Sequence, residues 1–104
     1  VEDPGCAVAG AQAVYTDVWA SMGQEQEQSE REQAFKGFCV DEALMAKADP
    51  AAIVLHCLPA HRGEEISEAI LEGAASRIFD QAENRLHAQQ ALLASLLGAD
   101  GLEA

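Results

Sequence analysis

Residues 52–58 (Ala-Ile-Val-Leu-His-Cys-Leu) constrain the fold more than any other segment of the chain. Their apolar side chains fall at consecutive rather than alternate positions, which predicts a short strand that is buried on both faces. Pro59 follows and ends the strand, because proline has no backbone N–H to donate to a sheet. Strands buried on both faces are typical of parallel sheets covered by helices, so this segment favours an α/β fold.

The flanking segments continue an alternation of strands and helices. Residues 13–19 are rich in β-branched and aromatic side chains and predict a strand that ends near Asp17, and residues 76–80 predict a third short strand. Helices are predicted at 4–10, from Asp41, at 64–71 and at 82–97. We therefore expect an α/β fold that forms part of a doubly wound, Rossmann-like parallel sheet, with about three strands and flanking helices.

Local signals add detail to this pattern. Asp3, which precedes Pro4, and Asp41 are predicted to cap the N-termini of the helices that follow them. The polar run at 24–33 is compatible with a solvent-exposed helix, a mobile loop, or a loop that leads into a helix. In each case we expect its charged side chains to face solvent.

The last predicted helix carries more apolar surface than a small fragment can cover. Its leucines form one stripe that two further leucines widen: Leu86, Leu93 and Leu97, with Leu92 and Leu96. We expect part of this stripe to face something outside the chain.

Composition excludes several classes of function. The 104 residues suffice for one small domain, and the net charge of −12 leaves no basic surface for nucleic acid or for an anionic membrane. No run of about 18 apolar residues occurs, so no membrane span is expected. The chain starts with Val1, and no signal peptide follows, so we expect a cut inside a longer chain or a processed or truncated product.

Three cysteines occur, an odd number without a CxxC pair, which argues against a disulfide framework and fits a reducing compartment. We therefore expect a cytoplasmic protein if the source is bacterial, and a protein of the mitochondrial matrix if the source is an animal. His56, Cys57 and His61 lie close together in sequence, but their spacing matches no common zinc pattern, so no metal or other cofactor is expected.

Three polar clusters are expected at the carboxyl ends of the strands, where open α/β sheets bind ligands. They are residues 17–22, 56–59 and 83–85. Asp17 suits an ammonium group of a ligand, but an acid in this position more often caps a turn. Ser21 could bind a carboxylate through its hydroxyl and the next backbone N–H, or simply cap.

The other two clusters leave similar alternatives open. Cys57 is either a small core residue or a thiol polarised by nearby cations. His56 is more often a satisfied buried histidine than a catalyst. The bond between Leu58 and Pro59 is trans by default, and a cis bond would turn the Leu58 carbonyl toward a ligand. Arg85, predicted in the first turn of the last helix, suits an anion or an intrahelical ion pair.

Three strings, in order and with matching spacing, resemble signatures of the ornithine carbamoyltransferases. They are residues 15–23 (Tyr-Thr-Asp-Val-Trp-Ala-Ser-Met-Gly), 56–63 (His-Cys-Leu-Pro-Ala-His-Arg-Gly) and 79–87 (Phe-Asp-Gln-Ala-Glu-Asn-Arg-Leu-His). The likeness covers essentially the whole chain, and Cys39 is a modest departure. It implies that residues 1–104 are the C-terminal portion of the ornithine-binding domain, ending in a helix that packs on a carbamoyl-phosphate domain.

The resemblance also implies roles at the ornithine side of the site. Asp17 would bind the α-ammonium group of L-ornithine, and Ser21 and Met22 would complete the grip on its amino-acid end. Cys57 would lie beside the side-chain amine that attacks. Relatives that act on putrescine or on an acylated ornithine stay open as alternatives.

On the carbamoyl-phosphate side, the resemblance implies three binding residues, Cys57, Leu58 and Arg85, of which Cys57 and Arg85 would also be catalytic. The Leu58 carbonyl would hold the carbamoyl NH₂ group, and Arg85 would contact carbamoyl phosphate and stabilise charge on the carbonyl oxygen. The loop at 21–23 and the polar run after it would form a lid.

The implied activity is carbamoyl transfer from carbamoyl phosphate to the side-chain amine of L-ornithine, which yields L-citrulline and phosphate in arginine metabolism. The family's Ser-Thr-Arg-Thr and His-Pro-x-Gln strings belong to its carbamoyl-phosphate domain, which the resemblance also gives most of the homotrimer contacts. Neither string occurs in this sequence. We therefore expect the chain to be inactive alone. A non-catalytic amino-acid-binding module, or a protein that docks on an intact enzyme through the last helix, is the alternative.

Overall fold

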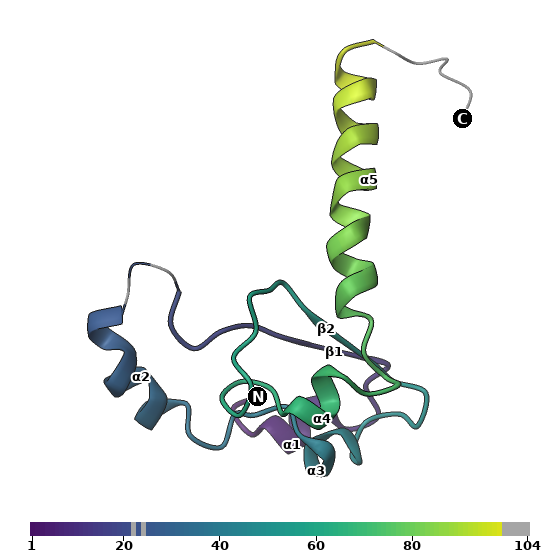
Figure 1. Cartoon of the computed structure of the whole chain (residues 1–104). Coiled ribbons are helices and arrows are strands. Elements are labelled where there is room, and N and C mark those ends of the chain that lie inside the picture. Colours follow the sequence, from purple (N-terminus) through teal and green to yellow (C-terminus); the bar gives the residue numbers. More distant parts are fainter. Residues whose placement is uncertain (22, 24, 99–104) are drawn as a thin grey trace.

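The computed structural model describes residues 1–21, 23 and 25–98 of the chain (Figure 1). In chain order its elements are α1 (Pro4–Val8), β1 (Ala13–Thr16), the 3₁₀ turn η1 (Glu25–Glu27), α2 (Gln28–Ala34), α3 (Glu42–Met45), β2 (Ile53–His56), α4 (Glu68–Leu71) and α5 (Ile78–Leu96). Strands and helices alternate, which confirms the α/β class. None of the helices in these residues combines the length and apolar character that crossing a membrane requires.

The sheet in the described residues has two parallel strands. β1 and β2 pair with Val14 opposite Val54 and Thr16 opposite His56. Parallel neighbours need a crossover connection, and η1, α2 and α3 lie in the segment that joins them. Because both strands run the same way, the loops that follow Thr16 and His56 leave the sheet at the same edge.

The prediction of a third strand at 76–80 is wrong. Ser76 forms a single parallel bridge to Val54, with Val54 N donating to the Ala75 carbonyl and Arg77 N donating to the Val54 carbonyl, both at 2.9 Å. The chain then enters α5 at Ile78, four residues before the predicted start of the helix at 82. Ile78 is fully buried as the first helical residue, so tertiary packing and the long helix override the strand propensity of this short run.

One face of the sheet packs into the core. Val14 and Val54 point into it together with side chains from the helices and loops: Val8, Val40, Ala48, Ala52, Ile66, Leu71 and Ile78. The other face is less covered than predicted, because Ile53 and Leu55 are only half-buried and Tyr15 is exposed. Among the larger helices of the described chain, α5 contacts β2, and it leaves much of this face open.

The predicted caps at Asp3 and Asp41 are confirmed. Asp3 Oδ1 accepts from Cys6 N at 2.7 Å, and Asp41 Oδ1 accepts from Leu44 N at 2.8 Å. Each carboxylate satisfies a backbone N–H that the first helical turn leaves unpaired. In both cases the local sequence signal was sufficient.

The predicted helix at 64–71 is too long. α4 starts only at Glu68, where Ser67 caps it by accepting from Ile70 N at 3.3 Å. Residues 61–66 instead form a tight turn in which Gly63 N donates to the Ile66 carbonyl at 2.8 Å. Gly63 has φ +84°, a conformation that side chains other than glycine rarely adopt.

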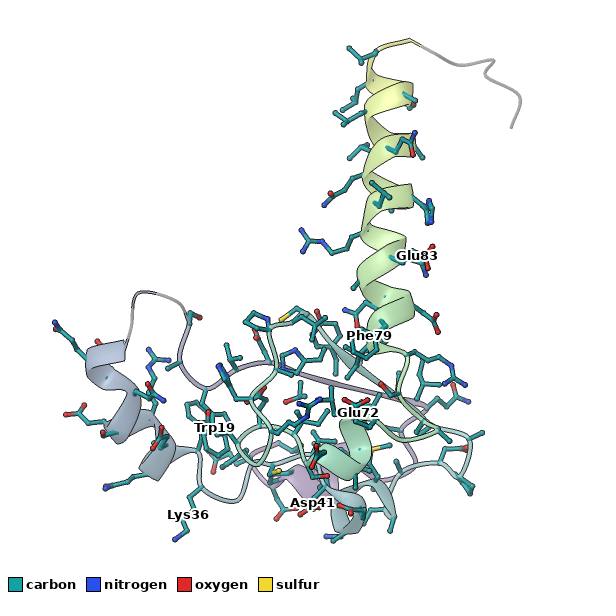
Figure 2. The ribbon with its side chains drawn as sticks, viewed as in Figure 1. Trp19, Lys36, Asp41, Glu72, Phe79 and Glu83 are labelled. Atoms are coloured by element: carbon teal, nitrogen blue, oxygen red, sulfur yellow. The ribbon has the colours of Figure 1, made fainter. Side chains whose placement is uncertain are left out.

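Residues 25–33 of the polar run are helical throughout, as η1 followed directly by α2, which confirms the first of the alternatives, a solvent-exposed helix. α2 buries none of its side chains. It is held at one end, where Trp19 stacks on Phe35 with ring centroids 6.4 Å apart and Arg31 donates to the Trp19 carbonyl at 3.2 Å. Figure 2 shows Trp19 between α2 and the rest of the molecule.

α5 projects away from the sheet for most of its length (Figure 1). Its leucine stripe is exposed as expected, from 59% for Leu92 and Leu93 to 83% for Leu97. Phe79, at the base of the helix, is also exposed (Figure 2).

Candidate functional site

A pocket of about 520 Å³ lies beyond the carboxyl ends of β1 and β2. It is lined by the loop after β1, the loop after β2 and one side of α2: residues 17–21, Gln28, Glu32, Leu58, Pro59, His61 and Glu64. This is the edge at which open α/β sheets bind ligands. Residues 17–21 of the first predicted cluster and Leu58 and Pro59 of the second therefore come together here.

A hydrogen bond joins these two clusters. The Cys57 thiol donates to Asp17 Oδ1 at 3.0 Å, and Val18 N donates to the same oxygen at 2.7 Å. Both donors favour the charged carboxylate, and the Cys57 thiol, followed by the Val18 N–H, holds the pKa of Asp17 below its usual range. Asp17 therefore presents a negative charge at neutral pH.

The same bond decides the state of Cys57. The Asp17 carboxylate accepts from its thiol and raises the pKa of Cys57 above the usual range, with burial adding to the effect. The hypothesis of a thiol polarised by cations is wrong for this structure, because its main electrostatic partner is an anion. Cys57 is a neutral hydrogen-bond donor at neutral pH.

The bond between Leu58 and Pro59 is cis, so the default expectation of a trans bond is wrong. Leu58 has φ +58°, and its backbone N–H donates to His56 Nδ1 at 2.8 Å. Both Leu58 and Pro59 line the pocket. The ring of His56 thus fixes the backbone of this loop through a hydrogen bond. Local sequence preference alone would not predict a positive φ for the residue before a proline.

Glu65 is a site residue that the sequence analysis missed. It is fully buried, and its Oε1 accepts from His56 Nε2 at 2.8 Å and from His61 N at 2.7 Å. Because His56 Nδ1 accepts from Leu58 N, the ring proton resides on Nε2 and points at Glu65. The expectation that His56 is a satisfied buried histidine is confirmed. The sequence signal that could have indicated Glu65 was its position as an acidic residue shortly after His56 and His61.

The third cluster does not reach this pocket. Arg85 lies in the second turn of α5 rather than in the first turn, because the helix begins earlier than predicted. It lines a separate pocket of about 590 Å³ between α5 and the open face of β2. Ser21 lines the first pocket, and Met22 lies outside the described residues.

The first pocket is acidic. Three of its lining residues carry carboxylates, Asp17, Glu32 and Glu64, and no lysine or arginine occurs among the lining residues of the described chain. Such a pocket suits a ligand with ammonium groups or a cation.

Comparison with known proteins identifies the family. The profile described as aspartate/ornithine carbamoyltransferase, Asp/Orn binding domain, matches residues 1–96. The chain belongs to this family. It is 81% identical over 98 residues to the ornithine carbamoyltransferase of Parasynechococcus marenigrum (strain WH8102), a match that covers 94% of this chain and 31% of that protein. The chain thus spans about a third of the length of this carbamoyltransferase.

Solved carbamoyltransferase structures share the fold. The ornithine carbamoyltransferase from Pyrococcus furiosus is 52% identical with a TM-score of 0.83, covering 90% of this chain and 30% of that one. The anabolic ornithine carbamoyltransferase from Campylobacter jejuni is 45% identical with a TM-score of 0.87, covering 93% and 32%. At these identities the carbamoyltransferase fold and the arrangement of its elements are shared across nearly all of the chain.

Proposed function

We propose that this chain is the ornithine-binding part of an ornithine carbamoyltransferase. In the complete enzyme it presents L-ornithine to carbamoyl phosphate, and the products are L-citrulline and phosphate. The observation that carries the proposal is the acidic pocket at the carboxyl ends of β1 and β2, in a chain of this family. The proposal places residues 1–104 in the C-terminal portion of the ornithine-binding domain, where β1 and β2 belong to a larger doubly wound sheet.

The charge of the pocket supports ornithine as the ligand. Ornithine carries two ammonium groups and one carboxylate, and a buried ammonium group needs an anionic partner. Asp17 is charged at neutral pH and lines the pocket, so it is our choice of partner for the α-ammonium group. Ser21 lines the same pocket and would hold the amino-acid end together with Met22.

The chemistry requires little covalent help from the protein. The neutral side-chain amine attacks the carbamoyl carbon, and a tetrahedral intermediate forms. The C–O bond to phosphate then breaks while the amine nitrogen loses a proton to the leaving phosphate. Holding the two reactants together and stabilising the oxyanion supply most of the acceleration. Cys57, a neutral donor bonded to Asp17, would lie beside the attacking amine, and the Leu58 carbonyl would accept from the carbamoyl NH₂ group.

Arg85 would contact the phosphate and the developing oxyanion. It lines the other pocket here, so this role requires a carbamoyl-phosphate domain to pack on α5 and bring the phosphate to it. The exposed leucines of α5 supply an apolar surface for that contact. The assembly would be a homotrimer, and the three free cysteines fit the reducing cytoplasm.

The separate position of Arg85 favours one other candidate. Without a partner domain, the acidic pocket would still bind a diamino acid, and the chain would be a non-catalytic amino-acid-binding module. The two candidates predict the same ligand but different activities in the presence of a carbamoyl-phosphate domain.

Complementation distinguishes them. The chain is mixed with a separately made carbamoyl-phosphate domain of a relative, and citrulline formation from ornithine and carbamoyl phosphate is measured, with each half alone as a blank. We expect activity only in the mixture, and loss of at least about 100-fold in Asp17→Ala and in Arg85→Ala, because each removes a charged contact.

Asp49→Asn and Arg62→Ala are the matched controls, since both residues lie outside the two pockets, and both variants should keep activity. Absence of citrulline despite demonstrated association of the two halves would reject catalysis. Ornithine binding by the same preparation would then establish the binding module.

A further inference from the structure

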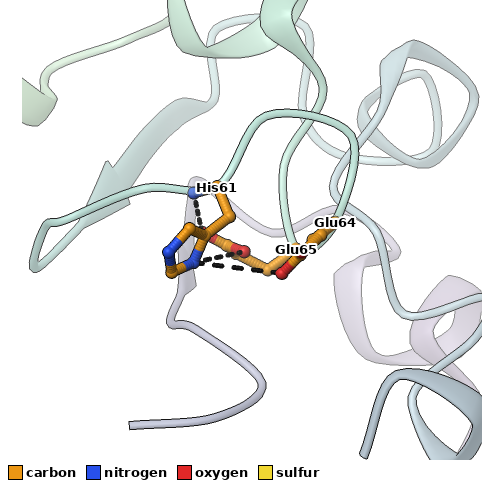
Figure 3. Close-up of side chains that lie close together, drawn as sticks. All are labelled: His61, Glu64 and Glu65. Atoms are coloured by element: carbon orange, nitrogen blue, oxygen red, sulfur yellow. Dashed lines mark hydrogen bonds and ion pairs between the residues drawn. The ribbon is translucent and has the colours of Figure 1, made fainter. Parts of the chain in front are cut away.

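Three side chains in the turn after β2 converge on one point. His61 Nδ1 lies 3.9 Å from Glu64 Oε2 and 3.9 Å from Glu65 Oε2, and the three candidate donor atoms lie within 4.8 Å of one another (Figure 3). The distances are too long for hydrogen bonds between the histidine and the carboxylates. The three donor atoms surround one point that an ion could occupy once the side chains close on it.

Glu65 supplies an independent sign of a ligand. Its side chain is fully buried and its Oε1 already accepts two hydrogen bonds, but its Oε2 is buried and accepts none from the described residues. A buried carboxylate oxygen without a partner is costly and rare in native proteins. This oxygen faces His61 across the cluster, so the unsatisfied atom points to where an ion would bind.

We propose that His61, Glu64 and Glu65 form a binding site for a divalent transition-metal ion of the zinc type. One imidazole nitrogen and two carboxylate oxygens are ligands that Zn²⁺ accepts, whereas Mg²⁺ and Ca²⁺ prefer oxygen alone. Bonds of about 2.1 Å at the tetrahedral angle put donor atoms about 3.4 Å apart. The two separations of 3.9 Å therefore need to shorten by about half an ångström, and a separation at the 4.8 Å limit by about 1.4 Å. Two of the three side chains are partly exposed and can make this adjustment.

The surroundings of the site hold one ligand rigidly. Glu65 Oε1 is fixed by His56 Nε2 and by the His61 backbone N–H, which leaves Oε2 aimed into the cluster. Hydrogen bonds of this kind orient ligating carboxylates in known metal sites. The turn that brings His61 back beside Glu65 depends on the positive φ of Gly63.

The site would face the acidic pocket. His61 and Glu64 line it, so three protein ligands would leave a fourth position open to water or to a pocket ligand. The negative charge of Asp17 and Glu32 on the same wall would add to the attraction for a cation.

Metal binding by the whole 104-residue chain tests the proposal without reference to catalysis. The chain is stripped with a chelator and titrated with Zn²⁺ against a chromophoric competitor, and Co²⁺ is used to report the ligands spectroscopically. We expect one Zn²⁺ per chain, and a Co²⁺ spectrum that lacks sulfur-to-metal charge transfer. His61→Ala and Glu64→Gln should each weaken Zn²⁺ binding at least about 10- to 100-fold, since loss of even an outer-shell partner costs that much.

Both variants change partly exposed side chains, so folding should persist, and circular dichroism checks it. Glu65→Gln is avoided as the primary test because it changes a buried residue. His87→Ala is the matched control, since His87 also lies near a carboxylate, Glu83, but on the exposed surface of α5. Cys57→Ser is the second control, and both should keep full affinity.

Three outcomes overturn the proposal. One is unchanged Zn²⁺ affinity in His61→Ala and Glu64→Gln, which would leave the contact between His61 and Glu65 as the only role of this pair. Another is loss of binding in Cys57→Ser, which would move the site to the thiol. The last is absence of binding at micromolar Zn²⁺. Because ornithine binding and citrulline formation are measured separately, failure here leaves the proposed function untouched.

Discussion

At the scale of single residues, the bond between Cys57 and Asp17 sets the charge of the pocket. Each group shifts the other, lowering the pKa of Asp17 and raising the pKa of Cys57. Because the pKa of Asp17 is lower in the folded chain, its carboxylate contributes stability above its unfolded pKa. That contribution is lost as pH falls through the folded pKa. Because the pKa of Cys57 is higher in the folded chain, its thiol contributes stability below its unfolded pKa. That contribution is lost as pH rises through the folded pKa. Both contributions are therefore fully present between the usual pKa of the carboxyl group, 3.8, and that of the thiol, 9.0.

Removing the charge of Asp17 should lower the pKa of Cys57. In an Asp17→Asn variant the thiol loses its anionic acceptor, so the pKa of Cys57 should fall toward its usual range. The alkylation rate of Cys57, followed as a function of pH in a Cys6→Ser and Cys39→Ser background, reports this pKa directly. Glu64→Gln is the control, because Glu64 lines the same pocket without a bond to Cys57. An unchanged titration curve in Asp17→Asn would mean that burial, not the carboxylate, raises the pKa.

At the scale of elements, the two largest helices contribute little to the core. α2 buries no side chain, and α5 buries only Ile78. α2 is tied to the loop after β1 through Trp19, so whatever moves α2 also moves residues that line the pocket. α5 instead presents its leucines to solvent, which is the arrangement of a docking helix rather than of a core helix.

Exposed leucines should matter for association and not for folding. Changing Leu92, Leu93 and Leu96 together to glutamine should alter the free energy of unfolding by less than about 1 kcal/mol, since exposed positions usually contribute little and glutamine favours helices almost as well as leucine. Association with a carbamoyl-phosphate domain, measured by analytical ultracentrifugation, should be lost.

Leu71→Ala is the contrasting variant for this helix test. Leu71 is buried, so its truncation should lower the free energy of unfolding by about 2–5 kcal/mol in a urea titration. If the triple variant still associates with the carbamoyl-phosphate domain, α5 is not the docking surface.

At the scale of the whole molecule, the chain is extended for its length. The radius of gyration is 16.9 Å, whereas a compact domain of this length has about 13 Å, and the projecting α5 accounts for the difference (Figure 1). The body beneath α5 is thin, because the sheet in the described residues has two strands and one incompletely covered face.

Small-angle scattering of the monomer should therefore give a radius of gyration near 17 Å, rising with concentration as exposed leucines drive self-association. The triple glutamine variant of α5 should keep the value near 17 Å at all concentrations, since the helix stays extended but loses three of the five leucines of its apolar stripe. A value near 13 Å for the unaltered monomer would instead show that α5 folds back on the sheet in solution.

Features that depend on neighbours in sequence could be predicted without a structure. The caps at Asp3 and Asp41, the two parallel strands and the exposed leucine stripe all follow from spacing and side-chain type within a few residues. The meeting of the segments at 17 and 57 followed as well, because parallel strands bring their carboxyl ends to one edge.

Tertiary structure decided what depends on partners far away in the chain. Ser76 forms only a single bridge beside Val54, and α5 begins two residues later with Ile78 buried in the core. Arg85 on this helix then lines a separate pocket. The His56 ring bonds to the Leu58 backbone on one side and to the buried Glu65 on the other, so it links two segments whose contact local sequence does not predict. Local propensity spans a few tenths of a kcal/mol per residue, and a buried hydrogen-bond network outweighs it.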